Sequence, residues 1–296
     1  MKYHAIAQAI LFSTTLTTVA TSALAQNIAD DANASDAIYA SNASTDVEVI
    51  NVFGDYSQLS LDQIAQSATI ISAEAVQQRH VNHIDGLLNM APNVNFTSGA
   101  SRGKYIQIRG IGERSQFAEP INPSVSFIVD EFDFSGLAAA GIIFDTKQLE
   151  VYRGPQATLY GTGALAGAVK LSSNNVGSDA PDYVEARIGN KESYRIEGAT
   201  GDDINADWGY RVALVHNRSD GFVENTFLDR SDTNNTDETA LRFAVEGNVD
   251  ERTTLALSYR WYDIDNGYDA FSLDNDNKTL SDEPGFDEHQ THAVSA

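Results

Sequence analysis

The sequence of 296 residues contains no cysteine. It therefore has no disulfide framework, no thiolate metal ligand and no cysteine nucleophile. Positive charge is also scarce, because 42 Asp and Glu residues outnumber 19 Lys and Arg residues and give a net charge of −23. Such an acidic chain is poorly suited to bind nucleic acid or an anionic lipid surface. The composition fits a secreted or surface-exposed protein.

Long hydrophobic runs are also missing. A membrane-spanning helix needs about 20 consecutive apolar residues, and no stretch after residue 25 approaches that length. The N-terminus instead has the pattern of a signal peptide over residues 1–25: Lys2, a moderately apolar segment at 5–20, and the cleavage signal Ala23-Leu24-Ala25. A membrane anchor is the alternative, but four threonines interrupt the run. A mature protein in a membrane would therefore cross it as β-structure.

Residues 26–45 are rich in Ala, Asp, Asn and Ser, which predicts a flexible linker. A short extended segment at 46–54 follows, rich in β-branched residues. It is either the edge strand of the next domain or a tethered strand that adds to the sheet of a partner protein. Its position after a linker favours the tethered strand. The residues concerned are Val47, Glu48, Val49, Ile50, Asn51 and Val52.

Residues 60–177 are predicted to form a compact α/β domain. Ser72 is placed to cap a helix that runs through Arg79, and Asn82 to cap a second helix that runs through Asn89. Gly/Ser/Pro-rich connections separate the predicted strands Thr69–Ile71, Val94–Phe96, Tyr105–Arg109, Val125–Val129 and Leu149–Tyr152.

The most informative segment is Gln148–Leu171, QLEVYRGPQATLYGTGALAGAVKL. Its glycine density indicates backbone packed in tight turns. The spacing of Gly161, Gly163 and Gly167 also suggests a dinucleotide loop, but such a loop must join a strand directly to a helix. Here the glycines begin eight residues after Tyr152 and lead into another strand, so structural glycines are the favoured interpretation.

Residues 182–296 are predicted to be β-strands with apolar residues on one face. The strands are Tyr183–Gly189, Ser193–Thr200, Trp208–Leu214, Ala240–Asn248 and Thr253–Asp263, with the start of a sixth possible. This alternation is typical of a membrane barrel, and a soluble β-sandwich is the alternative. Short connections alternate with long polar ones at 219–238 and 266–286, as in bacterial barrels. The opposite face carries Arg187, Arg195, Arg211, Arg242 and Arg260.

Four segments resemble, in the same order, motifs of the plug domain of TonB-dependent outer-membrane receptors. They are Asp85–Val94 (DGLLNMAPNV), Tyr105–Gly112 (YIQIRGIG), Ser126–Asp130 (SFIVD) and Gln148–Leu171. Asn93 and Glu131 stand where that family usually has glycine. The expected fold is therefore an α/β plug domain followed by antiparallel transmembrane β-barrel strands. A plugged transporter has about 22 strands, so the barrel is incomplete in this chain, which is either part of a longer receptor or a truncated product.

The resemblance implies energised import rather than catalysis. TonB would bind residues 47–52, the ligand would be a ferric siderophore or another iron complex, and the plug would face the barrel lumen and the periplasm. Cobalamin and oligosaccharide are alternative ligands. A passive porin-like or structural barrel protein, or a non-functional fragment, is the alternative of another class. No cofactor is implied, and no H-E-x-x-H or G-x-S-x-G motif is present.

The resemblance also assigns roles to single residues. Arg109 and Arg153 would lock the plug to the barrel wall through carboxylates, because an unpaired buried arginine is costly. Ligand contacts are expected from Arg102, Arg114, Phe117 and Phe134, with ordinary loop residues as the alternative. No metal site is predicted: the paired histidines lack a third ligand, and the acidic stretches 232–238 and 274–283 are interpreted as solvated loops, with weak Ca²⁺ binding as the alternative.

Overall fold

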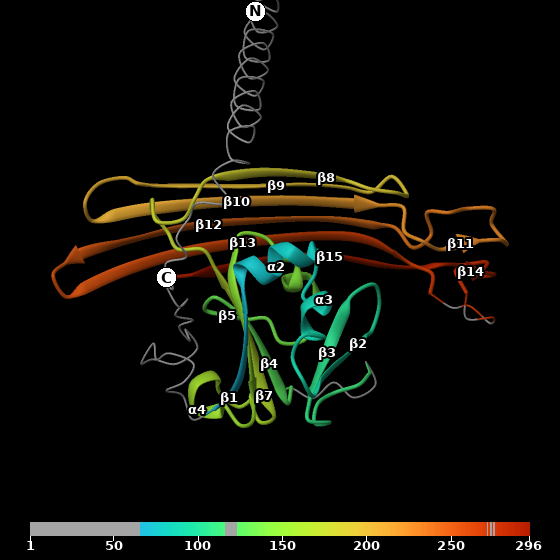
Figure 1. Ribbon diagram of the computed structural model, residues 1–296, viewed down its shortest axis with the longest axis horizontal. Helices are drawn as coiled ribbons and strands as arrows, with labels where there is room; N and C mark the ends of the chain where they lie inside the picture. Colours follow the sequence, from blue (N-terminus) through green and yellow to red (C-terminus); the bar gives the residue numbers. More distant parts are fainter. Residues whose placement is uncertain (1–65, 116–122, 271, 273, 275) are drawn as a thin grey trace, which may run out of the picture. The chain divides into compact units, whose positions relative to one another are not determined.

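The computed structural model describes residues 66–115, 123–270, 272, 274 and 276–296. The predicted signal peptide, the linker and the segment 47–52 lie outside these residues. Within them, no helix is long and apolar enough to cross a membrane. Two groups of elements make up the described chain, an α/β domain and a six-stranded antiparallel sheet (Figure 1).

The α/β domain is built on a five-stranded sheet with the order β1-β6-β7-β4-β5. β4 and β7 pair in parallel, and the other neighbours are antiparallel. Its strands are β1 (Ser67–Ser72), β4 (Val125–Val129), β5 (Phe132–Asp133), β6 (Thr146–Arg153) and β7 (Gly167–Ser173). A separate hairpin joins β2 (Val94–Ser98) to β3 (Gly103–Ile108). The helices are α2 (Ala73–Arg79), α3 (Asp85–Leu88), α4 (Ala157–Tyr160) and the 3₁₀ helix η1 (Ala138–Gly141).

The first predicted helix is confirmed and the second is corrected. Ser72 caps α2, since its hydroxyl accepts a hydrogen bond from the Ala75 amide at 3.4 Å. The predicted helix from Asn82 through Asn89 shortens to α3, which has no side-chain cap. The Asn82 side chain instead donates to the Asn217 Oδ1 atom in the six-stranded sheet, at 3.0 Å.

The six-stranded sheet has its strands in chain order, β8-β9-β10-β12-β13-β15, and every neighbouring pair is antiparallel. The strands are β8 (Tyr183–Ile188), β9 (Tyr194–Asp203), β10 (Trp208–Ser219), β12 (Thr236–Asp250), β13 (Thr253–Tyr268) and β15 (Gly285–Ser295). Short turns at 204–207 and 251–252 lie at one end. The long connections 220–235 and 269–284 lie at the other end, where β11 (Glu224–Asn225) and β14 (Lys278–Thr279) pair in parallel.

The two faces of the six-stranded sheet are those predicted by the alternation of residues. Apolar side chains such as Val184 and Ile188 are 86% and 90% exposed, whereas Arg211 and Val215 are completely buried. A soluble sandwich would bury its apolar face. Here the face with the arginines packs against the α/β domain, and the apolar face is open. Outer strands β8 and β15 each have a single neighbour among the described strands, so the sheet is not closed into a barrel.

One hydrophobic core continues from the α/β domain into the six-stranded sheet. Leu149 and Val151 of β6 and Val169 of β7 are fully buried, and the same cluster includes Val215 of β10 and Ile264 of β13. Burial of each such side chain is worth about 1.5–3 kcal/mol. The interface between the two groups of elements is therefore part of the core, and the polar contacts described next are set within it.

Candidate functional site

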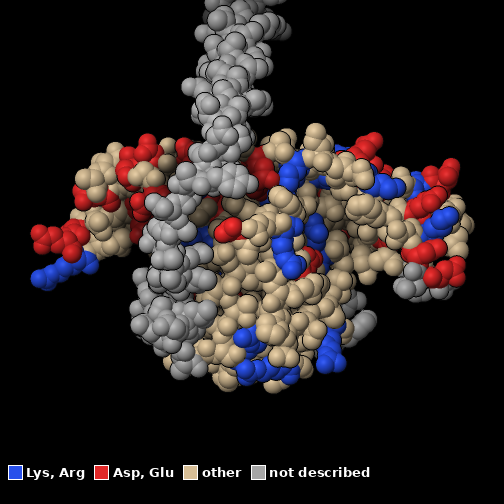
Figure 2. Space-filling view, viewed as in Figure 1, with Lys and Arg blue, Asp and Glu red and all other residues tan. Residues whose placement is uncertain are grey.

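Charged side chains gather where the α/β domain meets the six-stranded sheet. Figure 2 shows acidic and basic residues side by side along this boundary, while much of the α/β domain's visible surface is neither acidic nor basic. The ion pairs across the boundary fall into two groups. We call them the arginine cluster (Asp130, Asp145, Arg211, Arg242 and Arg260) and the Glu238 cluster (Arg102, Glu238, Asn217 and Asn266).

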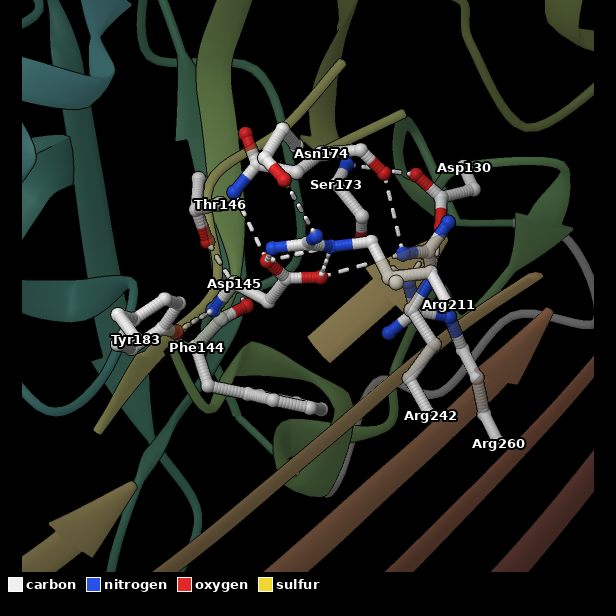
Figure 3. A network of polar contacts seen from close by, with 12 residues as sticks. Asp130, Phe144, Asp145, Thr146, Ser173, Asn174, Tyr183, Arg211, Arg242 and Arg260 are labelled. Carbon is white, nitrogen blue, oxygen red and sulfur yellow. Dashed lines mark hydrogen bonds and ion pairs between the residues drawn. The ribbon is translucent and has the colours of Figure 1, made fainter. Parts of the chain in front are cut away.

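Asp145 is the first centre of the arginine cluster (Figure 3). It precedes β6 with a left-handed backbone (φ 46°), which aspartate tolerates better than most residues. The Arg211 Nε atom lies 3.0 and 2.9 Å from its two carboxylate oxygens, and Arg211 Nη2 lies 2.6 Å from Oδ1. Arg242 Nη1 donates to Oδ2 at 3.2 Å, and Asn174 Nδ2 donates to Oδ1 at 2.8 Å. The Asp145 amide donates to the Tyr183 hydroxyl at 3.1 Å.

Asp130 is the second centre, at the end of β4, and also has a left-handed backbone (φ 53°). Arg260 donates to its Oδ2 atom, and Arg242 Nε lies 3.6 Å from the same oxygen. The Ser173 amide donates to Oδ1 at 2.7 Å. Burial raises the pKa of Asp130, but the charges of Arg260 and Arg242 outweigh burial and lower it below its usual value. The carboxylate is therefore ionised at neutral pH.

The arginine cluster has more positive than negative charge. Three guanidinium groups from β10, β12 and β13 share two carboxylates from the α/β domain. The Nε atoms of Arg242 and Arg260 are buried and have no hydrogen-bond acceptor among the described residues. Removing one partner of such a buried group leaves an uncompensated charge, which costs about 3–5 kcal/mol. Substitution of one member of the cluster is therefore expected to be strongly destabilising.

Glu238 of β12 is the centre of the second group and is completely buried. Arg102, from the turn between β2 and β3, binds it through both carboxylate oxygens, with Nε–Oε1 and Nη2–Oε2 distances of 2.5 and 2.7 Å. Asn266 of β13 donates to Oε1 at 2.9 Å, and Asn217 of β10 donates to Oε2 at 3.5 Å. A two-point arginine–carboxylate contact of this kind fixes orientation as well as distance.

The same turn has further polar contacts. The amide and hydroxyl of Ser101 both donate to Asp287 Oδ2, at 3.1 and 2.6 Å, and Asn266 Nδ2 donates to the Ser101 hydroxyl at 2.9 Å. Asp85 lies near Arg102, and its carboxylate is 3.2 Å from the His83 ring. Burial raises the pKa of Asp85, but the contact with His83 and the charge of Arg102 lower it to about 2.

Comparison with known proteins identifies the family of the α/β domain. The family model described as the TonB-dependent receptor plug domain matches residues 60–168. Residues 60–168 of the chain are a TonB-dependent receptor plug domain. The α/β domain is this plug, and its four motif segments are those that suggested the family in the sequence.

Individual relatives agree with this assignment. The pesticin receptor of Yersinia pestis is 29% identical over 130 residues, which is 44% of this chain and 19% of that protein. The vitamin B12 transporter BtuB of Vibrio vulnificus is 23% identical over 227 residues, 71% of this chain and 34% of that protein. The crystal structure of the ferric yersiniabactin uptake receptor FyuA from Yersinia pestis superposes with a TM-score of 0.65 at 19% identity, over 75% of this chain and 36% of that one. The chain thus spans about a fifth to a third of the length of these proteins.

Three of the four residues expected to contact ligand, Arg102, Arg114 and Phe134, lie in the described part of the chain. Phe134 is only 4% exposed, and its ring meets Tyr262 of β13 edge to face at 5.7 Å. Arg102 is held by Glu238. Both side chains therefore join the plug to the six-stranded sheet, and their expected contact with a ligand stays a prediction. Arg114 is exposed and keeps its predicted role as an expectation, and Phe117 lies outside the described residues.

Arg109 and Arg153, the predicted lock, lie close together on the plug but not at this interface. Arg153 donates to the hydroxyls of Ser67 and Thr69 and to the Ala68 carbonyl. It is next to the start of β1 and precedes α4, at the end of the plug remote from the six-stranded sheet (Figure 1). Burial and the charge of Arg109 lower the pKa of Arg153. Neither arginine contacts a carboxylate within the described part of the chain, so their role stays a prediction.

The arginine cluster has the reverse polarity of this predicted lock. At the arginine cluster the plug supplies the carboxylates and the six-stranded sheet supplies the cations. The sequence identified Arg211, Arg242 and Arg260 as facing inward, but it left their partners Asp130 and Asp145 unassigned. A usable signal was present, because three inward arginines need buried acceptors and Asp130 directly follows the predicted strand Val125–Val129.

Proposed function

We propose that the complete protein is a TonB-dependent receptor that imports a ferric siderophore or another iron complex across the bacterial outer membrane. The observation that carries this proposal is the plug held against successive antiparallel strands by the buried arginine cluster. A protein that only needs an open pore gains nothing from a folded domain fixed to its wall by ion pairs. The plug therefore points to gated passage, which requires an energy source to rearrange it.

The relatives support the class of ligand. Proteins similar to this chain include a pesticin receptor, a ferric-pyoverdine receptor and a ferric yersiniabactin uptake receptor. Vitamin B12 transporters are also among them, so cobalamin is the main alternative ligand and oligosaccharide a further one. Iron complexes are favoured because most of the similar solved structures are named for a siderophore or its ferric complex. A truncated product without its own transport function is the alternative for the chain taken alone.

We further propose that TonB binds residues 47–52 as an added strand. The support is the β-branched pattern of the segment and its place between a linker and the plug. Arg109 and Arg153 would then lock the plug to wall strands beyond this chain. Their place at the end of the plug away from the six-stranded sheet is consistent with that role, because the described strands leave this end uncovered.

The test is iron uptake by cells that produce the complete protein with Val49→Pro. Proline cannot donate the backbone hydrogen bond of a paired strand, so energised uptake should be lost while the iron complex still binds at the cell surface. Ala34→Pro, in the predicted linker, is the matched control and should leave uptake unchanged. Normal uptake by V49P would overturn the proposal and favour a passive barrel.

The ligand class is tested separately by growth. Cells with and without the gene are supplied with single iron sources, such as ferric yersiniabactin, ferripyoverdine or a ferric catecholate, and in a parallel arm with cobalamin. Gene-dependent growth on an iron complex supports the main proposal. Growth that depends on the gene only with cobalamin would replace iron by vitamin B12 as the cargo.

A further inference from the structure

The turn between β2 and β3 is attached to the six-stranded sheet at one particular place. Arg102 reaches the first residues of β12 through Glu238, and Ser101 reaches the last residues of β13 and the first residues of β15 through Asn266 and Asp287. All three strand ends lie where the long connections 220–235 and 269–284 begin or finish. A single plug turn thus contacts the bases of both long connections.

The described residues of the two long connections form one folded unit of their own. Asn225 of β11 is completely buried and donates to Asp269 Oδ2 and to the Ser281 carbonyl, at 2.8 Å each. Thr279 of β14 donates to the same Asp269 oxygen at 2.8 Å. Asp269 directly follows β13. If this unit unfolds, the end of β13, which carries Asn266, therefore loses the contacts that hold it.

Hydrogen bonds continue from this unit into the Glu238 cluster. The Asp269 amide donates to Asn234 Oδ1 at 3.2 Å, and the Gly267 amide donates to the Asn235 carbonyl at 3.0 Å. The Asp237 amide donates to Asn266 Oδ1 at 2.8 Å. Asn266 is therefore held by the base of one connection while its amide nitrogen holds both Glu238 and the plug turn.

We propose that Arg102 and Glu238 form a latch that couples the plug turn to the folded state of the two long connections. The Glu238 side chain has no exposed surface, so its buried charge needs Arg102 as a partner. If the start of β12 moves, Arg102 therefore moves with Glu238. Loosening of the connections shifts Asn266 and Glu238, and the turn follows them. The coupling is a property of the folded chain and holds whether or not the protein imports iron.

Arg102 is a positioning residue in this arrangement. Its side chain is only 18% exposed, and its Nε and Nη2 donors are both used by Glu238. A ligand that took Arg102 would leave Glu238 buried and unpaired. A change in the two long connections therefore reaches the plug through the latch. Arg102 does not need to contact a ligand for this.

Hydrogen exchange of the complete protein in detergent micelles tests the latch directly. Glu238→Gln should raise exchange in residues 98–104 about 10- to 100-fold, since charged hydrogen bonds contribute about 1.5–3 kcal/mol. Glu246→Gln, which removes an exposed glutamate of the same strand, is the matched control and should leave this peptide unchanged. Arg102→Lys keeps the charge but loses the two-point contact, so it should give an intermediate increase.

The coupling itself requires a double-mutant cycle. Asn225→Ala should raise exchange in 220–235 and, through the latch, in 98–104. In the Glu238→Gln background the same Asn225→Ala change should have a much smaller additional effect on 98–104. An equal effect of Asn225→Ala with and without Glu238, or no effect on 98–104 at all, would overturn the proposal. If Glu238→Gln prevents folding, the cycle is run with Arg102→Lys and the same outcomes apply.

Discussion

Asp145→Asn is the most informative perturbation of the arginine cluster. The asparagine keeps the shape of the side chain but removes one of two negative charges that hold three buried guanidinium groups. Asp145 accepts from both Arg211 and Arg242, and it is only 3% exposed. Loss of one partner from a buried ion pair costs about 3–5 kcal/mol. The amide side chain of the variant would retain one acceptor oxygen, so we expect the lower end, about 3 kcal/mol.

The assay is native-state hydrogen exchange in β6 and β7 of the complete protein in detergent micelles. A loss of about 3 kcal/mol corresponds to exchange roughly 100-fold faster. Asp179→Asn, an exposed position in the connection that follows the plug, is the matched control and should change exchange by less than about threefold.

A second variant separates charge from shape. Adding Arg211→Met to Asp145→Asn removes the uncompensated cation, because methionine fills a similar volume without charge. Protection in β6 and β7 should then recover by at least about tenfold. If Asp145→Asn exchanges like the parent protein, or if the double variant is no better protected than the single one, the cluster does not hold the plug electrostatically.

Two further predictions concern pH and aromatic packing. The folded-state pKa of Asp85 is about 2, against a usual 3.8, so its contribution of about 2 kcal/mol is complete above pH 4 and is lost as the pH falls toward 2. Unfolding measured from pH 7 to pH 2 should show this loss, and Asp85→Asn should remove that part of the pH dependence; an unaltered profile would contradict it. Phe134→Ala should lower the free energy of unfolding by about 3–5 kcal/mol, because the packing against Tyr262 is lost. Denaturant titration measures this loss. A loss under about 1 kcal/mol would show that the edge-to-face contact contributes little.

Local signals in the sequence were sufficient for most of the elements. The Ser72 cap depends on residues three positions apart, and α2 begins where it was predicted. Alternation along β10 and β13 identified the inward faces, because burial repeats every second residue in a strand. The Asn82 helix was wrong for a long-range reason. The Asn82 side chain donates a hydrogen bond to Asn217, 135 residues later in the chain, and does not cap the helix.

The candidate site was less predictable because its partners are distant in sequence. Arg260 and Asp130 are 130 positions apart, and no periodicity within a strand specifies which plug residue meets it. The resemblance implied ligand contacts for Phe134 and Arg102 in outward connections of the plug, and that role stays a prediction. Such connections usually lie at the surface, but these two lie against the six-stranded sheet. Connection type alone does not distinguish a surface that faces solvent from one that faces another part of the same chain.

The opposite polarity of the two clusters has a consequence for how the plug is oriented. At the turn between β2 and β3 the plug presents a cation to Glu238, whereas at Asp130 and Asp145 it presents anions to arginines. A plug rotated within the wall would bring aspartate toward glutamate and Arg102 toward arginine. Like charges brought together in this way cost several kcal/mol. Between the plug and these six strands, the pattern of signs therefore favours the observed orientation over one in which the two clusters exchange partners.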